Sequence, residues 1–293
     1  MVEQLINGIV VGSMYALVAI GYTLVFGLLD KLNLAHGDVF MFGGYAGLFA
    51  LTNGLPPWVA LVVAALVGGC LGLLIELLSF RKFTSHDAQI TACLSTVALG
   101  MVITDLTQRV WGTEPVNLNL SAEIYNKGFV IFGTSVSFVQ LGIVVASIAL
   151  MIFLTLGVHQ TKIGRFMRTV AENPTASSLI GIDPKKVTKQ VFFISSALAG
   201  IAGMLLALRT SVVSSNIGLA FGIKALAVMA IGGLGDLRGA FFGGLAIGII
   251  EAMAFNFGWG SMADMLVWIF LIITLIVKPS GLFVSKAQTE VRA

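Results

Sequence analysis

Two oppositely charged residues lie deep inside apolar segments of this chain, where a charge is costly and is usually paired or functional. Lys224 falls within the apolar segment 218–234, and Glu251 falls within the next one, 240–258. If both segments are helical, each residue lies about 10 Å from the same side of the membrane. We predict an ion pair between adjacent helices near an outer gate. Equally, Lys224 could extend its ammonium group to the interface while Glu251 is protonated or faces a wet cavity.

The turn from Asn33 to Asp38 places polar groups at the start of another apolar segment. Free backbone N–H groups at a helix start attract carboxylates, so this turn could contact a solute. Helix starts at a membrane interface also carry polar caps that bind nothing. We favour a gating or structural role for Asn33, His36 and Asp38 over direct contact with a ligand.

Residues 159–189 form the longest polar interruption of the chain, and they are rich in Lys and Arg. Asn173 can start a short helix there because its side chain caps free N–H groups, and Pro174 suits the first helical position. Gly181 can end that helix because Gly accepts the left-handed conformation. A short capped helix between basic segments at the face of a membrane protein is typical of a docking element for a soluble partner.

Several kinds of chemistry find no support in the sequence. The dipeptide Gly-Lys does not occur, so no Walker A phosphate loop can be formed. His36, His86 and His159 are far apart, and no acid, base and nucleophile are grouped. Cys70 and Cys93 lie in apolar segments and are interpreted as buried thiols, without a disulfide or a metal site. We therefore expect no enzymatic activity, cofactor or metal, and the dispersed basic residues do not favour nucleic acid.

The composition places the chain in a lipid bilayer. Hydrophobic residues make up 57% of it, charged residues 11%, and the mean hydropathy is +0.99. We expect an all-α, polytopic helical transmembrane bundle, because several apolar segments reach the roughly 20 residues that cross a bilayer. The predicted crossings are 4–28, 34–53, 58–80, 89–111, 137–157, 190–209, 218–234, 240–258 and 263–278, which makes about nine spans. The whole of 1–293 is expected to form a single transmembrane domain, with a cytoplasmic loop at about 159–189.

The distribution of basic residues predicts the orientation. With the N-terminus outside and the C-terminus in the cytoplasm, most of the 17 Lys and Arg residues fall on the cytoplasmic side, in agreement with the positive-inside rule. These residues are Lys31, Arg81, Lys82, Lys162, Arg165, Arg168, Lys185, Lys186, Lys189, Arg238, Lys278, Lys286 and Arg292. The outside then holds one sizeable loop, roughly 112–136, with Glu114, Glu123 and Lys127. It could cap the pore, meet an extracytoplasmic protein or simply connect two spans.

Glycine spacing predicts where helices pack closely. Helices in lipid associate where small residues let their backbones approach, and the chain contains 34 Gly residues. Four pairs have the G-x-x-x-G spacing: Gly8 and Gly12, Gly43 and Gly47, Gly68 and Gly72, and Gly244 and Gly248. In addition, the segment from Asn33 to Gly37 has a short echo in Asn216 to Gly222. Such internal repeats are common in transporters, although this match is short.

Several motifs together resemble a known family. They are Asn33-Leu34-Ala35-His36-Gly37; Gly164-Arg165 and Arg168 with Glu172-Asn173, Ala176 and Gly181-Ile182; Gly232-Gly233-Leu234-Gly235 with Gly239-Ala240 and Gly243-Gly244; and Lys278-Pro279-Ser280-Gly281-Leu282-Phe283. The chain resembles the inner-membrane permeases of the branched-chain amino acid ABC importers over nearly its whole length. Leu34, Asp38 and Ser177 depart mildly from the usual motifs, which bears on the solute more than on the architecture.

The resemblance implies a permease subunit that forms half of a translocation pore. Its partners would be a second, related permease, two cytoplasmic ATPases and an extracytoplasmic solute-binding protein, all at a bacterial-type inner membrane. The family's coupling helix, which contacts the ATPase, corresponds here to Glu172, Asn173, Pro174, Thr175, Ala176, Ser177 and Gly181. Members of the family look able to carry branched-chain amino acids, other amino acids, amides or urea.

Residues and resemblance together predict an ATP-driven importer subunit that is not itself an enzyme. ATP hydrolysis is expected in the partner subunits, and closure of the ATPases would move the helix at 172–181. The alternative is a stand-alone channel or an ion-coupled secondary carrier. The sequence from Asn33 to Ala35 faintly resembles the turn of water and glycerol channels, but its second copy is missing. Glu251 is the best candidate for an ion-coupling group in a carrier.

Overall fold

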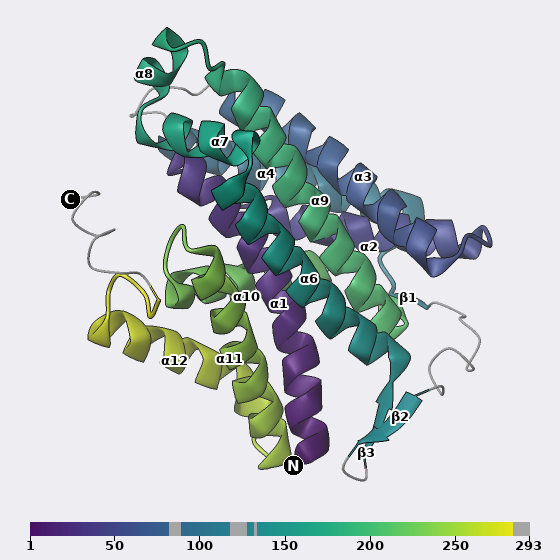
Figure 1. Cartoon of the computed structure of the whole chain (residues 1–293). Helices are drawn as coiled ribbons and strands as arrows, with labels where there is room; N and C mark the ends of the chain where they lie inside the picture. The colour runs from purple at the N-terminus through teal and green to yellow at the C-terminus, as the bar shows by residue number, and fades with distance from the viewer. Residues whose placement is uncertain (82–88, 118–127, 132–133, 284–293) are drawn as a thin grey trace. The chain divides into compact units, whose positions relative to one another are not determined.

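The computed structural model describes residues 1–81, 89–117, 128–131 and 134–283, and within them the protein is mostly helical (Figure 1). This confirms the predicted all-α class. The helices are α1 (Val2–Leu29), α2 (His36–Thr52), α3 (Pro57–Ile75), the π-helix η1 (Glu76–Phe80), α4 (Gln89–Trp111), α6 (Phe138–Gln160), α7 (Lys162–Glu172), α8 (Pro174–Leu179), α9 (Pro184–Thr210), α10 (Ile217–Gly232), α11 (Leu237–Asn256), the 3-10 helix η3 (Gly260–Met262) and α12 (Ala263–Val277). Lys82, His86, Glu123, Lys127, Lys286 and Arg292 lie outside the described residues, so the predictions that involve them stay predictions.

Among the residues that the structure describes, seven helical segments are long and apolar enough to cross a membrane. They are α1, α3 continued by η1, α4, α6, α9, α11 and the segment Gly260–Val277. The helices α2 and α10 also coincide with predicted crossings, but they contain 17 and 16 residues. At 1.5 Å per residue they extend about 24 to 26 Å, which is less than the roughly 30 Å of hydrocarbon. The chain is a multi-pass membrane protein, whereas nine crossings and an external N-terminus stay predictions.

The chain divides into two compact units. The first comprises Met1–Thr23, Asn119–Ile152 and Lys224–Ala293, and the second comprises Leu24–Leu118 and Phe153–Ile223. The helices α1, α6 and α10 each contribute residues to both units.

In the first unit, glycines bring α1 and α11 into backbone contact. A Cβ added at Gly12 would lie 2.8 Å from the carbonyl oxygen of Gly244, and one added at Gly248 would lie 2.3 Å from the amide nitrogen of Gly12. Gly8 faces the same stretch of α11, with the carbonyl oxygen of Gly248 2.9 Å from its added Cβ. The G-x-x-x-G pairs of these two helices therefore pack against each other, as predicted from their spacing.

In the second unit, α2, α3 and α9 pack together through the other two glycine pairs. A Cβ at Gly43 of α2 would lie 2.3 Å from the Cα of Gly200 in α9, and one at Gly68 of α3 would lie 2.5 Å from the carbonyl oxygen of Ser196. Gly47 and Gly72 also lie against side chains of α9. The packing predicted for these pairs is confirmed, and it makes α9 a central element of this unit.

The starts of the two short helices also meet in the second unit. A Cβ at Gly37, near the start of α2, would lie 2.3 Å from the carbonyl oxygen of Gly218, near the start of α10. The rings of Phe40 and Phe221 stack one turn further along each helix, with centroids 5.1 Å apart. The two segments that echo each other in the sequence are therefore in direct contact.

Two short antiparallel ribbons occupy part of the region that we predicted as the outer loop. The strand β1 (Val116–Asn117) pairs with β4 (Val212–Val213) in the second unit. The strand β2 (Gly128–Ile131) pairs with β3 (Thr134–Ser137) in the first. The helix α9 begins at Pro184 and not near residue 190, because Asp183 caps it by accepting from the backbone N–H of Lys185 at 2.9 Å.

Candidate functional site

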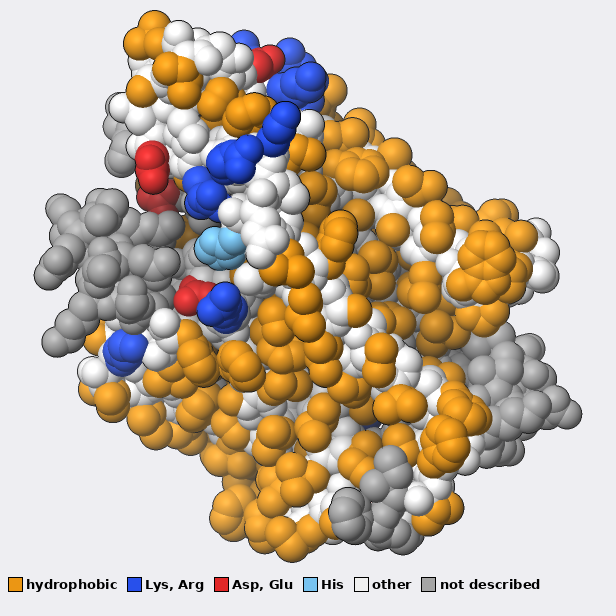
Figure 2. Space-filling view, in the orientation of Figure 1, with side chains coloured by type: hydrophobic (Ala, Val, Ile, Leu, Met, Phe, Trp, Pro, Cys, Tyr) orange, Lys and Arg blue, Asp and Glu red, His pale blue; other side chains and the backbone are white. Residues whose placement is uncertain are grey.

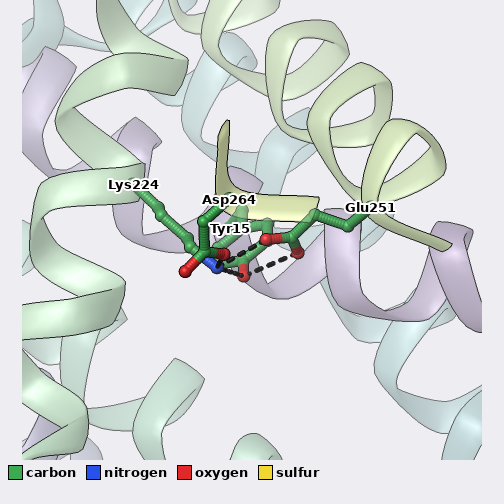
Figure 3. A network of polar contacts seen from close by, with 4 residues as sticks. All are labelled: Tyr15, Lys224, Glu251 and Asp264. Atoms are coloured by element: carbon green, nitrogen blue, oxygen red, sulfur yellow. Dashed lines mark hydrogen bonds and ion pairs between the residues drawn. The ribbon is translucent and has the colours of Figure 1, made fainter. Parts of the chain in front are cut away.

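The structure brings Lys224 and Glu251 together within the first unit (Figure 3). Lys224 lies in the middle of α10 and Glu251 lies in the last third of α11, and the Lys224 Nζ is 2.5 Å from the Glu251 Oε1. Their side chains are 17% and 10% exposed. A charge buried to this extent needs an oppositely charged partner and further hydrogen bonds. Only well-oriented contacts compensate for the hydration that it loses.

Tyr15 and Asp264, which the sequence analysis did not select, complete this network. The Tyr15 hydroxyl donates to the Glu251 Oε2 at 2.9 Å and accepts from the Lys224 Nζ at 3.3 Å. The Asp264 Oδ1 lies 2.8 Å from the Lys224 Nζ, and the Asp264 side chain is 70% exposed. Each of the three Lys224 N–H donors therefore has an acceptor. We call Tyr15, Lys224, Glu251 and Asp264 the Lys224 network.

The glycine contact between α1 and α11 explains why Tyr15 reaches Glu251. Tyr15 follows Gly12 by three residues, and Glu251 follows Gly248 by three residues. Gly8 faces Gly248 whereas Gly12 faces Gly244, so the two helices run antiparallel, and Tyr15 and Glu251 lie one turn to either side of the contact between Gly12 and Gly248. Helical side chains lean towards the N-terminus of their own helix, so these two side chains reach back towards that contact and meet across it. Asp264 comes from the first turn of α12. Two carboxylates and one ammonium group give the network one excess negative charge, which the exposed Asp264 can share with solvent.

The predicted coupling segment forms a short exposed helix, α8, in the second unit. The Asn173 Oδ1 accepts from the backbone N–H groups of Thr175 and Ala176 at 3.0 and 2.9 Å, so the predicted cap is present. Gly181 has a φ of +85°, the left-handed conformation expected after a helix end. Ser177 is fully buried and its hydroxyl donates to the carbonyl of Pro174 at 2.7 Å.

The exposed part of this segment combines polar and apolar side chains. Glu172, Asn173, Pro174, Thr175 and Ala176 are exposed in the structure. Leu179 and Ile180, at the end of α8, are 85% and 70% exposed. The sequence analysis did not select these two residues, although two apolar residues beside Gly181 in a basic polar stretch are an available signal. Together they give α8 an apolar tip outside the predicted spans.

The helix before α8 is fixed to the end of α6. The Arg168 guanidinium donates to the carbonyl oxygens of Val158 and His159 in the last turn of α6. Thr161 caps α7 by accepting from the Gly164 N–H at 3.1 Å, and its hydroxyl donates to the Gly157 carbonyl at 2.5 Å. Arg168 therefore joins α7 to α6, and we call the junction the α6–α7 corner.

The third predicted group, Asn33, His36 and Asp38, lies at the start of α2 in the second unit. Asn33 is 1% exposed, and its side-chain amide has no hydrogen-bond partner among the described residues. His36 is fully buried. The Asp38 Oδ1 accepts from the Thr104 hydroxyl at 3.0 Å. The structure thus places this turn among packed helices, and its role in gating stays a prediction.

Among the described residues, no group of three or more His, Cys, Asp or Glu side chains is placed to hold a metal ion. Cys70 and Cys93 are both free thiols, but neither is buried as predicted. Cys70 is exposed on an outer face of α3, where lipid would cover it, and Cys93 is partly exposed.

Comparison with known proteins identifies the family. Residues 4–275 match the family described as the branched-chain amino acid transport system / permease component. The chain belongs to this family. It is 31% identical to the high-affinity branched-chain amino acid transport system permease protein LivH of Escherichia coli, over 96% of this chain and 94% of the relative. It is 32% identical to the corresponding protein BraD of Pseudomonas aeruginosa, with the same coverage.

The chain is also similar to a permease that is named for another class of solute, a sugar. The fructose import permease protein FruF of Bifidobacterium longum is 29% identical over 80% of this chain and 64% of the relative. Membership in the branched-chain amino acid transport system / permease component family therefore makes the chain a transport permease component. It does not by itself name the solute.

Proposed function

We propose that this chain is a transmembrane subunit of an ATP-driven importer for branched-chain or related amino acids, amides or urea, located in a bacterial-type inner membrane. It forms half of the translocation pore with a second permease, and two cytoplasmic ATPases and an extracytoplasmic solute-binding protein complete the assembly. The observation that carries this proposal is the family match over residues 4–275, together with the near full-length identity to permeases named for branched-chain amino acids.

In this proposal, α8 is the element that receives work from the ATPase. Its support is a capped, exposed helix with the apolar tip Leu179 and Ile180, in a chain whose sequence has no phosphate loop of its own. Apolar side chains that stay exposed outside the bilayer mark contact surfaces for partners. Glu172, Asn173, Pro174, Thr175, Ala176, Ser177 and Gly181 shape the contact. The α6–α7 corner then passes the movement to α6.

Reconstitution with the partner subunits tests this role. We expect ATP-dependent uptake of solute into proteoliposomes, and we expect deletion of 173–181 or Ala176→Asp to abolish both uptake and ATPase association. Gln160→Glu is the matched control, because it adds the same charge at an exposed residue at the end of α6 without changing α8. Normal uptake by either α8 variant, with the ATPase still bound, would contradict the proposal.

The Lys224 network is proposed as part of a gate near the outer face, and the turn with Asn33, His36 and Asp38 as a second gating element. The network supports a gate because its four residues come from α1, α10, α11 and α12, so any relative movement of these helices must change it. Charge exchange tests the gate. Lys224→Glu/Glu251→Lys should recover more uptake than either single reversal, and a double variant no better than the single ones would contradict the role of this pair.

A stand-alone channel or an ion-coupled carrier is the rival. Glu251 favours a carrier, because it is an intramembrane carboxylate that could bind a coupling ion. However, Glu251 is already paired with Lys224 and Tyr15, so its carboxylate has less capacity to bind such an ion. Liposomes that contain the purified chain alone distinguish the two functions. If a proton or sodium gradient drives solute accumulation in the absence of ATPases, the chain is a carrier and not an importer subunit.

A further inference from the structure

An apolar groove lies between α3, α7 and α9 in the second unit. It has a volume of about 410 Å³ and is lined by Leu73, Ile163, Lys189, Gln190, Phe193 and Ile194. The Phe193 ring forms part of its wall because Gly69 of α3 has no side chain there, and a Cβ at Gly69 would lie 2.5 Å from that ring. If water filled a space of this size, roughly a dozen molecules would face apolar carbon, with which they cannot form hydrogen bonds. An acyl chain is therefore a better occupant than water.

Lys189 lines this groove, and four more basic residues lie on the same two helices, α7 and α9. Lys162 and Arg165 lie on α7 beside Ile163, and Lys185, Lys186 and Lys189 lie on the first turns of α9. Figure 2 shows Lys and Arg side chains gathered over these two elements, next to a face that is mainly hydrophobic. Among the described residues, none of the five forms an ion pair. Arg168 is excluded from this group because its guanidinium is bound to the end of α6.

Helix geometry places the charges and the apolar wall in the order that a phospholipid requires. Lys189 precedes Phe193 by four residues, so its stem lies one turn of about 5.4 Å above that ring on the same face of α9. Lys185 lies one turn further towards the start of α9. Lys189 lines the same groove as Leu73, which places it beside α3. The groove therefore runs from apolar side chains to a cationic rim.

We propose that this groove binds one anionic phospholipid, with an acyl chain against Leu73, Ile163, Phe193 and Ile194 and its phosphate at Lys189 and Lys186. An anionic lipid fits better than a zwitterionic one because the five cations outnumber the two acids of the same polar stretch, Glu172 and Asp183. Asp183 is also engaged in capping α9. Amphipathic helices with basic flanks such as α7 lie in the interface and prefer anionic lipid. Ile163 and Phe166, which are 46% and 42% exposed, supply the apolar face of α7.

Native mass spectrometry of the full-length chain in detergent tests this site, with dioleoylphosphatidylglycerol and dioleoylphosphatidylcholine added at equal concentration. We expect one retained phosphatidylglycerol in preference to phosphatidylcholine. Lys186→Gln and Lys189→Gln should each lower the affinity for phosphatidylglycerol about five-fold and reduce the preference. Ile163→Ser should weaken both lipids to the same degree. Arg238→Gln is the matched control, since it removes a predicted cytoplasmic charge that does not line the groove.

Three outcomes would overturn the proposal. The first is equal retention of the two lipids by the wild-type chain, and the second is unchanged phosphatidylglycerol affinity in the Lys186→Gln/Lys189→Gln double variant. The third is displacement of the lipid when the ATPase subunits are added, which would assign the groove to a protein partner. Lipid retention is measured without transport, so its failure leaves the importer proposal intact.

Discussion

The Lys224 network and the α8 helix both depend on polar side chains, but they are built over different distances along the chain. Tyr15 and Glu251 are 236 residues apart and Lys224 and Glu251 are 27 apart, whereas Asn173 caps N–H groups only two and three residues away. The network exists only when four helices are packed together. The cap can form as soon as its own turn is helical.

This difference sets how strongly each region should respond to mutation. In the network, removing Lys224 or Glu251 leaves an uncompensated charge away from water, which costs about 3 to 5 kcal/mol. In α8, removing the cap leaves N–H groups that solvent can reach, and this costs about 1 kcal/mol. The first region should therefore respond strongly to substitution and the second weakly.

The largest effect is expected for Lys224→Met. It leaves Glu251 buried without its cation, so the free energy of unfolding should fall by about 3 to 5 kcal/mol. Thermal unfolding in detergent measures this. The double variant Lys224→Met/Glu251→Gln should recover most of the loss, because Asp264 is exposed enough to be solvated alone. Arg109→Met is the matched control, since the Arg109–Asp105 pair is 73% and 60% exposed and should contribute at most about 1 kcal/mol. Equal losses of unfolding free energy for Lys224→Met and Arg109→Met would contradict the large contribution expected of the Lys224 network.

A somewhat smaller effect is expected for Gly248→Leu. The new side chain would meet the backbone of Gly12, which cannot yield as a flexible side chain can, so about 1 to 3 kcal/mol should be lost. Thermal unfolding in detergent measures the loss. Adding Tyr15→Phe to Gly248→Leu should lower the stability little further, because Tyr15 should already have moved away from Glu251. Gly142→Leu on α6 is the control, because nothing lies within 4 Å of a Cβ at Gly142. Similar behaviour of the two variants would show that the glycine contact does not position the network.

An intermediate effect is expected for Arg168→Ala at the α6–α7 corner. The change removes two charge-assisted hydrogen bonds to carbonyl groups, worth about 1.5 to 3 kcal/mol each when intact, although part of this is recovered by solvation. The reconstituted assembly should keep hydrolysing ATP while its uptake falls several-fold. Arg165→Ala on the same helix should change the ratio of uptake to hydrolysis little. A parallel fall in hydrolysis and uptake would argue against transmission through this corner.

The smallest effect is expected for Asn173→Ala. Loss of the cap should cost about 1 kcal/mol within α8, and uptake should decrease a few-fold at unchanged expression. Asn173→Asp keeps an acceptor oxygen and should restore uptake, which separates the cap from any direct contact of the Asn173 amide. If both variants lose uptake equally, Asn173 contacts the partner and its cap is secondary.

The same contrast explains what the sequence could predict. Asn173, Pro174 and Gly181 define α8 because caps and left-handed glycines act over a few residues. The glycine pairs were also predictable, since their spacing reflects one face of a helix. Lys224 and Glu251 were selected by their cost in an apolar segment, and the structure pairs them. The cost of a charge in an apolar segment does not reveal which other polar groups contact it. For this reason Tyr15 and Asp264 were not predicted as members of the network.

Three other differences between the sequence-based predictions and the structure also have physical reasons. The start of α9 was placed too late because Lys185, Lys186 and Lys189 make its first turns polar, although Asp183 caps them into the helix. Leu179 and Ile180 were overlooked because hydropathy alone does not show that an apolar pair outside a span stays exposed. Hydropathy also does not reveal that α2 and α10 end before the full bilayer thickness.

The shortness of α2 and α10 has a consequence for permeation. Peptide groups beyond the ends of a helix cannot be solvated by acyl chains, so protein or water must enclose them. Gly37 and Gly218 bring two such ends together, and the first-turn N–H groups of both helices lie near the same crossing. A hydrated passage through this protein would meet partial positive charge at that crossing, which would slow cations and favour the carboxylate end of a zwitterion.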